Sequence, residues 1–383
     1  MQETMPVNYV ILKWAREKQG LTLEEVAKRF KKDVSEIKAW ESGKKAPTYV
    51  QLEKLAYELY KRPIALFCFP APPKEGPLTE SFRTLPAGEI AKISPKLRSI
   101  IRKAKAIQIV LQELRGAQNN LINEFSFAGK DSARLIVKKV RADLQISFEE
   151  QCSWKSFTEA LKKWRAALEN KGIFIFKEAF RDNTFAGFCL RDQSFPLIYL
   201  NNSQSQGRQI FTLFHELGHL LRGENGIYPD SNKYLDFLTG RPKEIEIFCN
   251  QFAAAFLVPD DVFAGAISEE KKVSERLISD LSLKYKVSRE VILRKFFEKK
   301  MVTPLEYNNF VKKWKSSLKN TKKGTGGNYY KTQGVYVSRN YAKVIFQKYY
   351  QNTISLPEVA GYLGVKVKSV EGIEQAFFKR SLV

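Results

Sequence analysis

The feature that most constrains the fold is one amphipathic stretch, RQIFTLFHELGHLLRG, which holds both histidines of the 383-residue chain. His215 and His219 stand four positions apart, so on an α-helix they lie one turn apart on the same face. Their apolar neighbours recur at helical spacing, and Gly223 provides a stop. The stretch therefore predicts a helix that presents both imidazoles to one point.

Chance is a poor explanation for the spacing of the two histidines. Two histidines scattered at random over such a chain fall four apart in roughly 0.5% of cases, and a glutamate directly after the first lowers this to about 0.03%. Both imidazoles can reach one cation, while Glu216 projects close to the opening between them. This is the H-E-x-x-H arrangement of zinc peptidases, here H-E-L-G-H. The alternative is a buried helix that carries two hydrogen-bonded histidines.

A zinc site of this kind needs a further ligand. A catalytic zinc usually takes three protein ligands and leaves the fourth position to water. Because the chain holds no third histidine, the last ligand must be an acid or a cysteine. The candidates lie near RPKEIEIFCNQFAAAFLVP, an amphipathic helix that can pack against the motif helix. Glu246 would point a carboxylate at the metal, and the alternatives are Glu244, Asp236 and Cys249.

Near the N-terminus, apolar residues recur at helical spacing from Tyr9 to Tyr60 in four or five short runs. Gly20 ends the first run, and Thr22 with Glu25 forms a capping box for the second. Asp33 can cap the third run. These signals predict a tight bundle of short helices, which the segment FPAPPKEGP closes because it cannot continue a helix.

The remaining chain predicts a mainly α architecture with a small β-sheet (α+β). Residues 90–150 have a helical pattern, and the runs IFIFKEAF, FAGFCLRD and PLIYLN predict three short strands. A Gly-rich break, KKGTGGNYY, precedes a last unit in the manner of a helix-turn-helix. We expect a five-helix helix-turn-helix bundle at 1–70, a linker and helical bracing region at 71–150, a zincin-like peptidase domain with trailing basic helices at 151–320, and a helix-turn-helix-like unit at 321–383.

The net charge of +23 is concentrated in the C-terminal third of the chain. Residues 261–383 carry 24 basic against 11 acidic side chains, and residues 281–348 carry 17 against 3. Such a density suits contact with DNA phosphates or with an acidic partner, and a solvated helix face is the equal alternative. No apolar run approaches the roughly eighteen residues of a membrane span, and the N-terminus lacks an export signal. We therefore expect a cytoplasmic protein with no membrane partner.

The motifs together resemble the ImmA/IrrE metallopeptidases with an N-terminal Xre-type helix-turn-helix. The resemblance is carried by EIKAWESGKKAP, ESFRTLP, FAGFCLRD with PLIYLNN, FTLFHELGHLL, the E-x-x-C-N-x-F-A-A pattern of Glu246–Ala254, VSREVILRKF and GGNYYKT. It implies Zn2+ as cofactor and places the third ligand at Glu246. Cys249 departs from the family pattern, in which alanine is more usual at this position.

The chemistry of such a site predicts a mechanism. Zinc held by His215, His219 and Glu246 would lower the pKa of a bound water and polarise a peptide carbonyl. Glu216 would take the proton and pass it to the leaving amine. The resemblance implies that the substrate is a DNA-binding repressor or an antitoxin-like regulator, as in stress-response or toxin–antitoxin regulation, and a homo-oligomer is compatible with it. The alternative is a DNA-binding transcriptional regulator whose metal site is a sensor or is inactive.

In an Xre-like domain the third helix, here about Val34–Glu41, enters the major groove of DNA. Ser35, Lys38 and Ala39 would face bases, while Lys44 and Lys45 would sit near the DNA backbone. Carboxylates on or beside these helices oppose phosphate binding, and they are Glu24, Glu25, Asp33 and Glu36. Two interpretations stay open, specific DNA binding and a degenerate domain that binds protein.

Overall fold

The computed structural model describes residues 7–116, 132–181, 184–229, 232–268, 270, 272–318 and 334–378. The chain divides into two compact units, which are described separately. Unit 1 comprises residues 1–81 and 87–103, and unit 2 comprises residues 82–86 and 104–383. The predicted class is confirmed, because the structure is mainly helical with one small four-stranded sheet.

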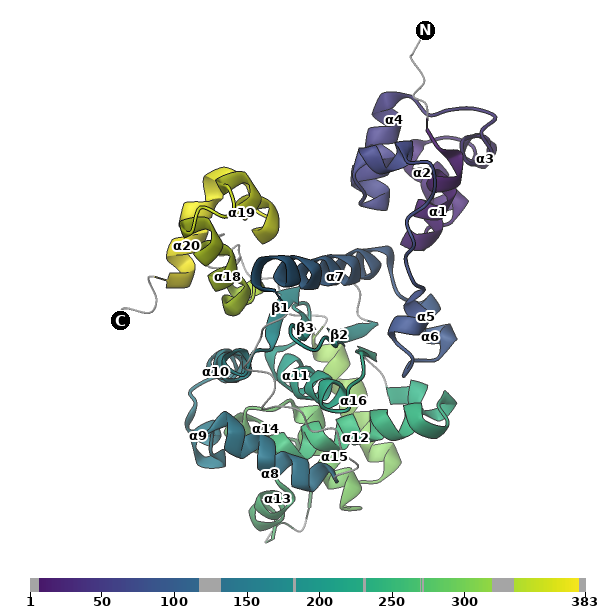
Figure 1. Ribbon diagram of the computed structural model, residues 1–383. Helices are drawn as coiled ribbons and strands as arrows, with labels where there is room; N and C mark the ends of the chain where they lie inside the picture. Colours follow the sequence, from purple (N-terminus) through teal and green to yellow (C-terminus); the bar gives the residue numbers. More distant parts are fainter. Residues whose placement is uncertain are drawn as a thin grey trace. The chain divides into compact units, whose positions relative to one another are not determined.

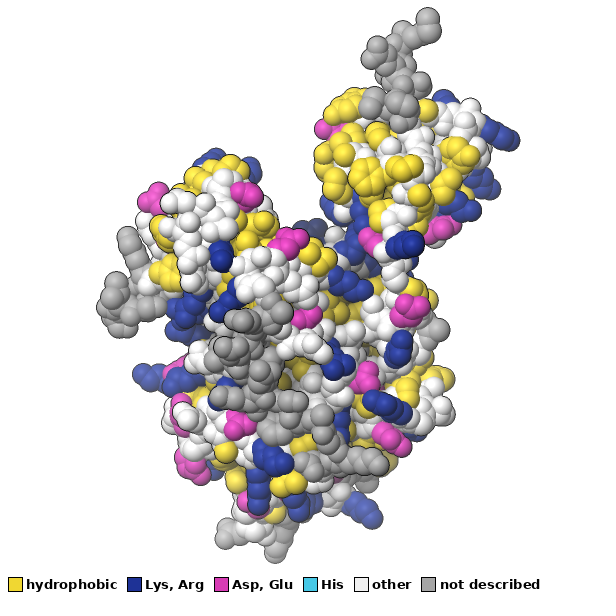
Figure 2. Space-filling view, in the orientation of Figure 1, with side chains coloured by type: hydrophobic (Ala, Val, Ile, Leu, Met, Phe, Trp, Pro, Cys, Tyr) yellow, Lys and Arg dark blue, Asp and Glu magenta, His cyan; other side chains and the backbone are white. Residues whose placement is uncertain are grey.

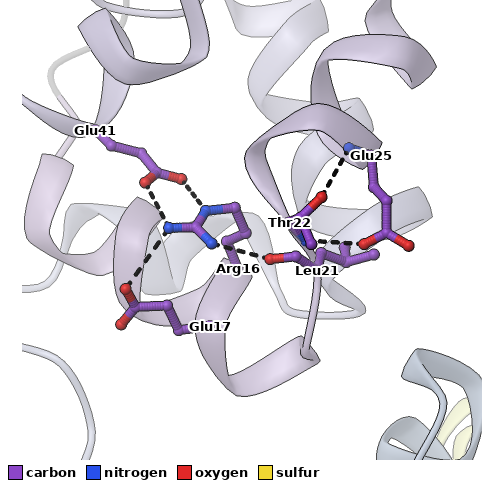
Figure 3. A network of polar contacts seen from close by, with 6 residues as sticks. All are labelled: Arg16, Glu17, Leu21, Thr22, Glu25 and Glu41. Carbon is purple, nitrogen blue, oxygen red and sulfur yellow. Dashed lines mark hydrogen bonds and ion pairs between the residues drawn. The ribbon is translucent and has the colours of Figure 1, made fainter. Parts of the chain in front are cut away.

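Unit 1 is a bundle of short helices (Figure 1). Its elements are α1 (Tyr9–Gln19), α2 (Leu23–Phe30), α3 (Val34–Glu41), α4 (Tyr49–Glu53), the π-helix η1 (Lys54–Tyr60), the 3-10 helix η2 (Ile64–Cys68), α5 (Leu78–Ser81) and α6 (Ala87–Ala91). The predicted capping box is confirmed, since the Thr22 hydroxyl accepts from the Glu25 N–H and the Glu25 carboxylate accepts from the Thr22 N–H (Figure 3). Gly20 ends α1 in the left-handed region, as expected.

Two interactions hold the first three helices of unit 1 together. Arg16 of α1 donates two hydrogen bonds to the Glu41 carboxylate of α3, at 2.7 and 3.0 Å (Figure 3). Trp40 is buried among the apolar side chains of this bundle, in edge contact with Phe30. A bidentate Arg–carboxylate pair fixes orientation as well as distance. The position of α3 is therefore fixed relative to α2 by the packing of Trp40 and relative to α1 by the ion pair of Glu41.

The predicted helical pattern of residues 90–150 is confirmed where the structure describes it. The helices are α7 (Pro95–Arg115), α8 (Ala133–Leu144) and α9 (Phe148–Ser153). The apolar stripe of α7 is buried, including Ile100, Ile101, Ile107 and Leu111. Since α7 begins in unit 1 and ends in unit 2, the chain passes between the units along a helix.

Unit 2 is built around a sheet with strand order β1-β3-β2-β4. The strands are β1 (Phe174–Glu178), β2 (Phe185–Leu190), β3 (Leu197–Asn201) and β4 (Gly226–Pro229). β1 pairs with β3 in parallel, whereas β2 pairs antiparallel with both β3 and β4. The first three strands were predicted, and the fourth was not.

Both faces of the sheet are buried. On one face the rings of Phe176, Tyr199 and Phe188 stack in a row, with ring centroids 5.0 and 5.1 Å apart. The other face supplies Ile175 and Ile198 to a core that it shares with the helices, and α11 (Gln206–Leu221) lies across it (Figure 1). Strands buried on both faces read as continuous apolar runs, which explains the composition of these segments.

The helices of unit 2 not yet named lie before and after α11 in the sequence. They are α10 (Phe157–Asn170), the 3-10 helix η4 (Asn232–Phe237), α12 (Gly240–Leu257), α13 (Asp260–Ala266), α14 (Glu275–Tyr285), α15 (Arg289–Glu298), α16 (Pro304–Leu318), α18 (Arg339–Tyr350), α19 (Leu356–Leu363), the 3-10 helix η5 (Val367–Ser369) and α20 (Val370–Phe378). The expected GGNYYKT element lies outside the described residues.

Polar contacts from α10 hold the start of the C-terminal helices. The Arg165 guanidinium donates to the carbonyls of Val335, at 2.7 Å, and Val337, at 3.4 Å. The Glu169 carboxylate accepts from the backbone N–H of Arg339 at 3.1 Å. These bonds satisfy the carbonyls of two residues before α18 and the N–H of its first residue. The chain is therefore attached to α10 at the point where the C-terminal helices begin.

Within the described residues, no single helix is long and apolar enough to cross a membrane. Only α12 and α13 taken together reach the required length and composition, and they are bent by 55° relative to each other.

Candidate metal centre

The helix α11 carries the H-E-L-G-H motif through the middle of unit 2. The Ser205 hydroxyl caps it by accepting from the Arg208 N–H, and the chain leaves it at Arg222. His215, Glu216 and His219 are all completely buried, although each is a polar residue. Figure 2 accordingly shows no histidine on the visible surface. A helix buried on nearly all sides places its polar side chains against other protein groups rather than water.

The helix α12 brings Glu246 to the motif. Phe214 of α11 stacks on Phe256 of α12, with ring centroids 4.2 Å apart. Gly218 lets the two helices approach, since a Cβ there would lie 3.1 Å from both Cα and Sγ of Cys249. Glu246 lies one turn before Cys249 and is completely buried. The sequence expectation that this second helix faces the motif helix is therefore confirmed.

Three side chains meet at one point, and we call His215, His219 and Glu246 the metal centre. The two Nε2 atoms are 3.2 Å apart, and each lies 3.4 Å from an oxygen of Glu246. Zinc–nitrogen and zinc–oxygen bonds of about 2.0–2.1 Å at tetrahedral angles separate two ligand atoms by about 3.3 Å. The donor set and its spacing therefore fit a tetrahedral zinc with one position left over.

Electrostatics at the centre are governed by burial and by mutual contact. Burial raises the pKa of Glu216 to about 7 and lowers the pKa of His215 to about 4. Burial also opposes charge on Glu246, but the two imidazoles outweigh it and hold the pKa of this carboxyl well below its usual range. Glu246 is thus ionised and ready to bind a cation, while Glu216 has the raised pKa that suits a general base.

Comparison with known families identifies two domains in the chain. Residues 168–297 match the IrrE N-terminal-like domain of the Peptidase_M78 family, and residues 12–57 match a helix-turn-helix family. The chain is a helix-turn-helix protein with an IrrE-like domain. The sequence-based resemblance is thereby confirmed. No curated protein and no solved structure matches the chain.

The IrrE-like domain contains a strand that sequence reasoning missed. β4 runs along the metal centre, where the Tyr228 ring stacks on the His215 ring with centroids 3.9 Å apart. The Gly226 N–H donates to the Cys189 sulfur at 3.2 Å. A Cβ on Gly226 would lie 2.7 Å from Oε2 of Glu216, so only glycine lets β4 come this close. The only local signal was the short run Gly-Ile-Tyr soon after the motif helix, which is too short to predict a strand by itself.

A cavity of about 490 Å³ in unit 2 lies next to the centre. Phe211, Tyr228 and Asn250 line it, and the first two also contact His215. Its charged side chains pair with one another: Arg208 with Glu290 at 3.2 Å, Arg294 with Glu298 at 3.6 Å, and both Lys295 and Arg134 with Asp260, at 2.6 and 3.5 Å. The cavity therefore adjoins side chains that contact the centre, and it carries little net charge.

The alternative ligands do not join the metal centre. Glu244 and Asp236 are exposed, and Cys249 is buried but does not belong to the group. Among the residues that the structure describes, the only group of three or more such side chains close enough to share an ion is His215, His219 and Glu246.

The helix-turn-helix domain places α3 and the following turn as expected from the sequence. Ser35, Lys38, Lys44 and Lys45 are exposed, while Ala39 is half-buried. Glu36 is engaged within the domain, because its carboxylate accepts from Lys32 at 2.6 Å and from Lys45 at 3.0 Å. These hydrogen bonds lower the pKa of Glu36. The negative charge of Glu36, which was expected to oppose phosphate binding, is thus partly neutralised. The Lys45 ammonium takes part in this ion pair and is therefore less available to a phosphate.

Proposed function

We propose that this protein is a cytoplasmic zinc-dependent endopeptidase, in which His215, His219 and Glu246 hold the metal. The observation that carries the proposal is the spacing of the three donor groups beside the buried Glu216: the two Nε2 atoms lie 3.2 Å apart, and each lies 3.4 Å from one oxygen of the Glu246 carboxylate. When bound, zinc supplies a Lewis acid that polarises a peptide carbonyl and lowers the pKa of a water molecule. The family match supports the assignment to a metallopeptidase.

In this proposal Glu216 is the proton carrier. Its raised pKa of about 7 suits both halves of the reaction, since the carboxylate first accepts a proton from the attacking water and the acid then donates it to the leaving amine. Tyr228 and Phe211 would keep the adjoining cavity apolar next to the centre. The paired charges farther along it suit a peptide chain better than a strongly charged ligand.

We further propose that the substrate is a DNA-binding repressor or an antitoxin-like regulator and that the helix-turn-helix domain brings the enzyme to DNA. In that domain Ser35, Lys38 and Ala39 would read base edges, while Lys44 and Lys45 would contact phosphates. The exposure of the four polar side chains supports this arrangement. Cleavage of a regulator would then take place where that regulator is bound.

The test compares three variants of the full chain, Glu216→Gln, Glu246→Ala and the control Glu244→Gln. Glu244 is exposed on the same helix as Glu246, so its substitution leaves the centre intact. Zinc is measured by elemental analysis, and hydrolysis is measured with a library of quenched fluorescent peptides and with purified repressors.

We expect about one zinc per chain in wild type, Glu244→Gln and Glu216→Gln, and none in Glu246→Ala, because one lost ligand opens the site. Hydrolysis should be lost in both Glu216→Gln and Glu246→Ala. Retained hydrolysis in Glu216→Gln would remove this residue from its role. A wild-type chain that binds zinc but hydrolyses nothing would favour the other candidate, a DNA-binding regulator with a sensory metal site.

A further inference from the structure

The C-terminal helices α18, α19 and α20 take no part in the proposed peptidase, yet they repeat the architecture of the helix-turn-helix domain. The three helices pack on one another as a bundle (Figure 1). We call residues 339–378 the C-terminal trihelical unit. Its helix α19 begins as α2 does, with a capping box in which Ser355 and Glu358 exchange the same two hydrogen bonds as Thr22 and Glu25 (Figure 3). The two boxes stand at the start of helices of equal length, eight residues each.

The turn after each helix is also the same. Lys31 and Gly364 both adopt the left-handed region, with φ of 54° and 68°. In each turn the next residue donates its N–H to an alanine carbonyl five positions back, at 3.1 and 2.9 Å. An extended residue then starts the following helix, Asp33 with φ −72° and ψ 150° or Lys366 with φ −75° and ψ 146°. The matching torsions of these residues, together with the shared hydrogen bond, indicate a similar mutual direction of the helices on either side of the turn.

The buried positions correspond as well. Aligning Thr22 with Ser355 pairs apolar residues that are at most 3% exposed in both units. The pairs are Val26 with Val359, Ala27 with Ala360, Ile37 with Val370, and Trp40 with Ile373. The C-terminal trihelical unit is therefore a second helix-turn-helix in which different side chains fill the same frame.

The polar positions of the two units differ in charge. Three carboxylates of the first helix-turn-helix have no acidic counterpart in the second, where Glu24, Asp33 and Glu36 are replaced by Pro357, Lys366 and Ser369. Ser35, which leads the first recognition helix, is replaced by Lys368. Lys366 and Lys368 are both exposed, and no described residue forms an ion pair or hydrogen bond with their ammonium groups. Two unpaired cations thus stand at the start of the helix that a helix-turn-helix inserts into DNA.

The two glutamates of α20, Glu371 and Glu374, do not prevent this helix from entering the major groove of DNA. Glu374 accepts a hydrogen bond from Tyr350 of α18 and is turned toward its own unit. Glu371 is exposed at the position of Lys38 and accepts from Gln375 at 3.2 Å. In a major groove a glutamate can accept from the amino group of cytosine, and a glutamine can pair with adenine. The acid therefore suits a base edge, whereas the two lysines suit phosphates.

We infer that the C-terminal trihelical unit binds duplex DNA, with Lys366 and Lys368 on phosphates and with Glu371 and Gln375 at base edges. The lysine side chain at position 368 is long enough to reach the DNA backbone from the position at which the shorter Ser35 would face a base. Duplex RNA fits poorly because its deep, narrow major groove does not admit a helix. The chain would then have two DNA-binding units, one on each side of the IrrE-like domain in the sequence.

The test measures DNA binding by the full chain as a function of salt. A fluorescent duplex of about 30 base pairs, long enough for two half-sites, is titrated with wild type, with Lys366→Gln/Lys368→Gln, and with the control Lys138→Gln/Lys162→Gln. The control removes the same charge from two exposed lysines of α8 and α10, which lie outside the basic segment 281–348. Circular dichroism establishes that each variant is folded, which the exposure of all four lysines favours.

Each phosphate contact contributes about 0.9 to the slope of log affinity against log salt, so two lost contacts should lower it by about 1.8. Between about 50 and 200 mM salt, wild-type affinity should then fall about 12-fold more than that of Lys366→Gln/Lys368→Gln. The control should keep the wild-type slope. In a chain with Lys38→Gln and Lys44→Gln, the remaining salt-sensitive binding should depend on the same two C-terminal lysines.

Equal slopes for Lys366→Gln/Lys368→Gln and the control would overturn the inference. The same holds if the C-terminal variant binds DNA normally but loses self-association or capture of a protein partner, because the unit would then be a protein-docking surface. Hydrolysis is not part of this readout, so the inference can fail or succeed independently of the proposed peptidase activity.

Discussion

Gly226→Ala should weaken zinc binding although this residue supplies no ligand. A Cβ built on Gly226 would lie 2.3 Å from Cδ2 and 2.5 Å from Cγ of His219. Carbon atoms in contact stand about 3.5–4.0 Å apart, so the imidazole ring or the strand must move by about 1.2 Å. Metal–ligand distances tolerate only about 0.2 Å. The methyl group therefore pushes one ligand out of the geometry that the other two define.

The magnitude follows from what outer contacts of metal ligands usually contribute. Changes to such contacts lower metal affinity about 10- to 100-fold, which corresponds to about 1.4–2.8 kcal/mol. The assay is competition for zinc with a chelator of known affinity. Gly265→Ala is the matched control, because a Cβ there meets nothing within 4 Å. If both alanine variants bind zinc as tightly as wild type, the contact between β4 and His219 does not constrain the centre and the reasoning is refuted.

Three further predictions concern stability and anchoring. Phe256→Ala should lower the free energy of unfolding in urea by about 3–5 kcal/mol, because its ring is fully buried and stacked on Phe214; a loss below about 1 kcal/mol would contradict this packing. The Lys295 ammonium lowers the pKa of Asp260 in the folded protein. The pair therefore stabilises the fold above the unfolded-state pKa of about 3.9, and this contribution disappears as the pH falls through the lower pKa of the folded state. Asp260→Asn should flatten the dependence on pH, in this acidic range, of the free energy of unfolding measured in urea. Arg165→Ala should expose residues 334–378 to earlier chymotrypsin cleavage than wild type, while Lys162→Ala on the same helix should not.

The metal centre was partly readable from the sequence because helical periodicity is a local property. The positions of His215 and His219 on one helix, and the second helix that carries Glu246, follow from apolar residues three and four positions apart. Glu246 itself could not be separated from its alternatives by spacing alone, since Glu244 and Cys249 lie on the same helix. Only packing against α11 decides which side chain turns inward.

The strand β4 could not be predicted from the sequence, because it depends on pairing with a distant strand. Its four residues, Gly226–Pro229, are too few for a reliable alternation, and they include a proline. Their extended conformation is stabilised by pairing with β2, whose paired residues lie 37 to 44 positions earlier in the chain. Tyr228 and Gly226 therefore became site residues through a tertiary contact. The C-terminal helices were readable for the opposite reason, because capping residues and a glycine turn act within a few positions.

Because the chain has only two histidines and both lie in the metal centre, their imidazole rings can report on the centre by spectroscopy. The chain contains no imidazole other than those of His215 and His219, and both belong to the group of side chains that would hold zinc. Isotopic labelling of histidine alone would thus give a nuclear magnetic resonance spectrum of two rings, free of signals from the rest of a 44.1 kDa chain. Zinc binding, competing metals and a docked peptide could each be followed in the native sequence, without a mutation or an attached probe.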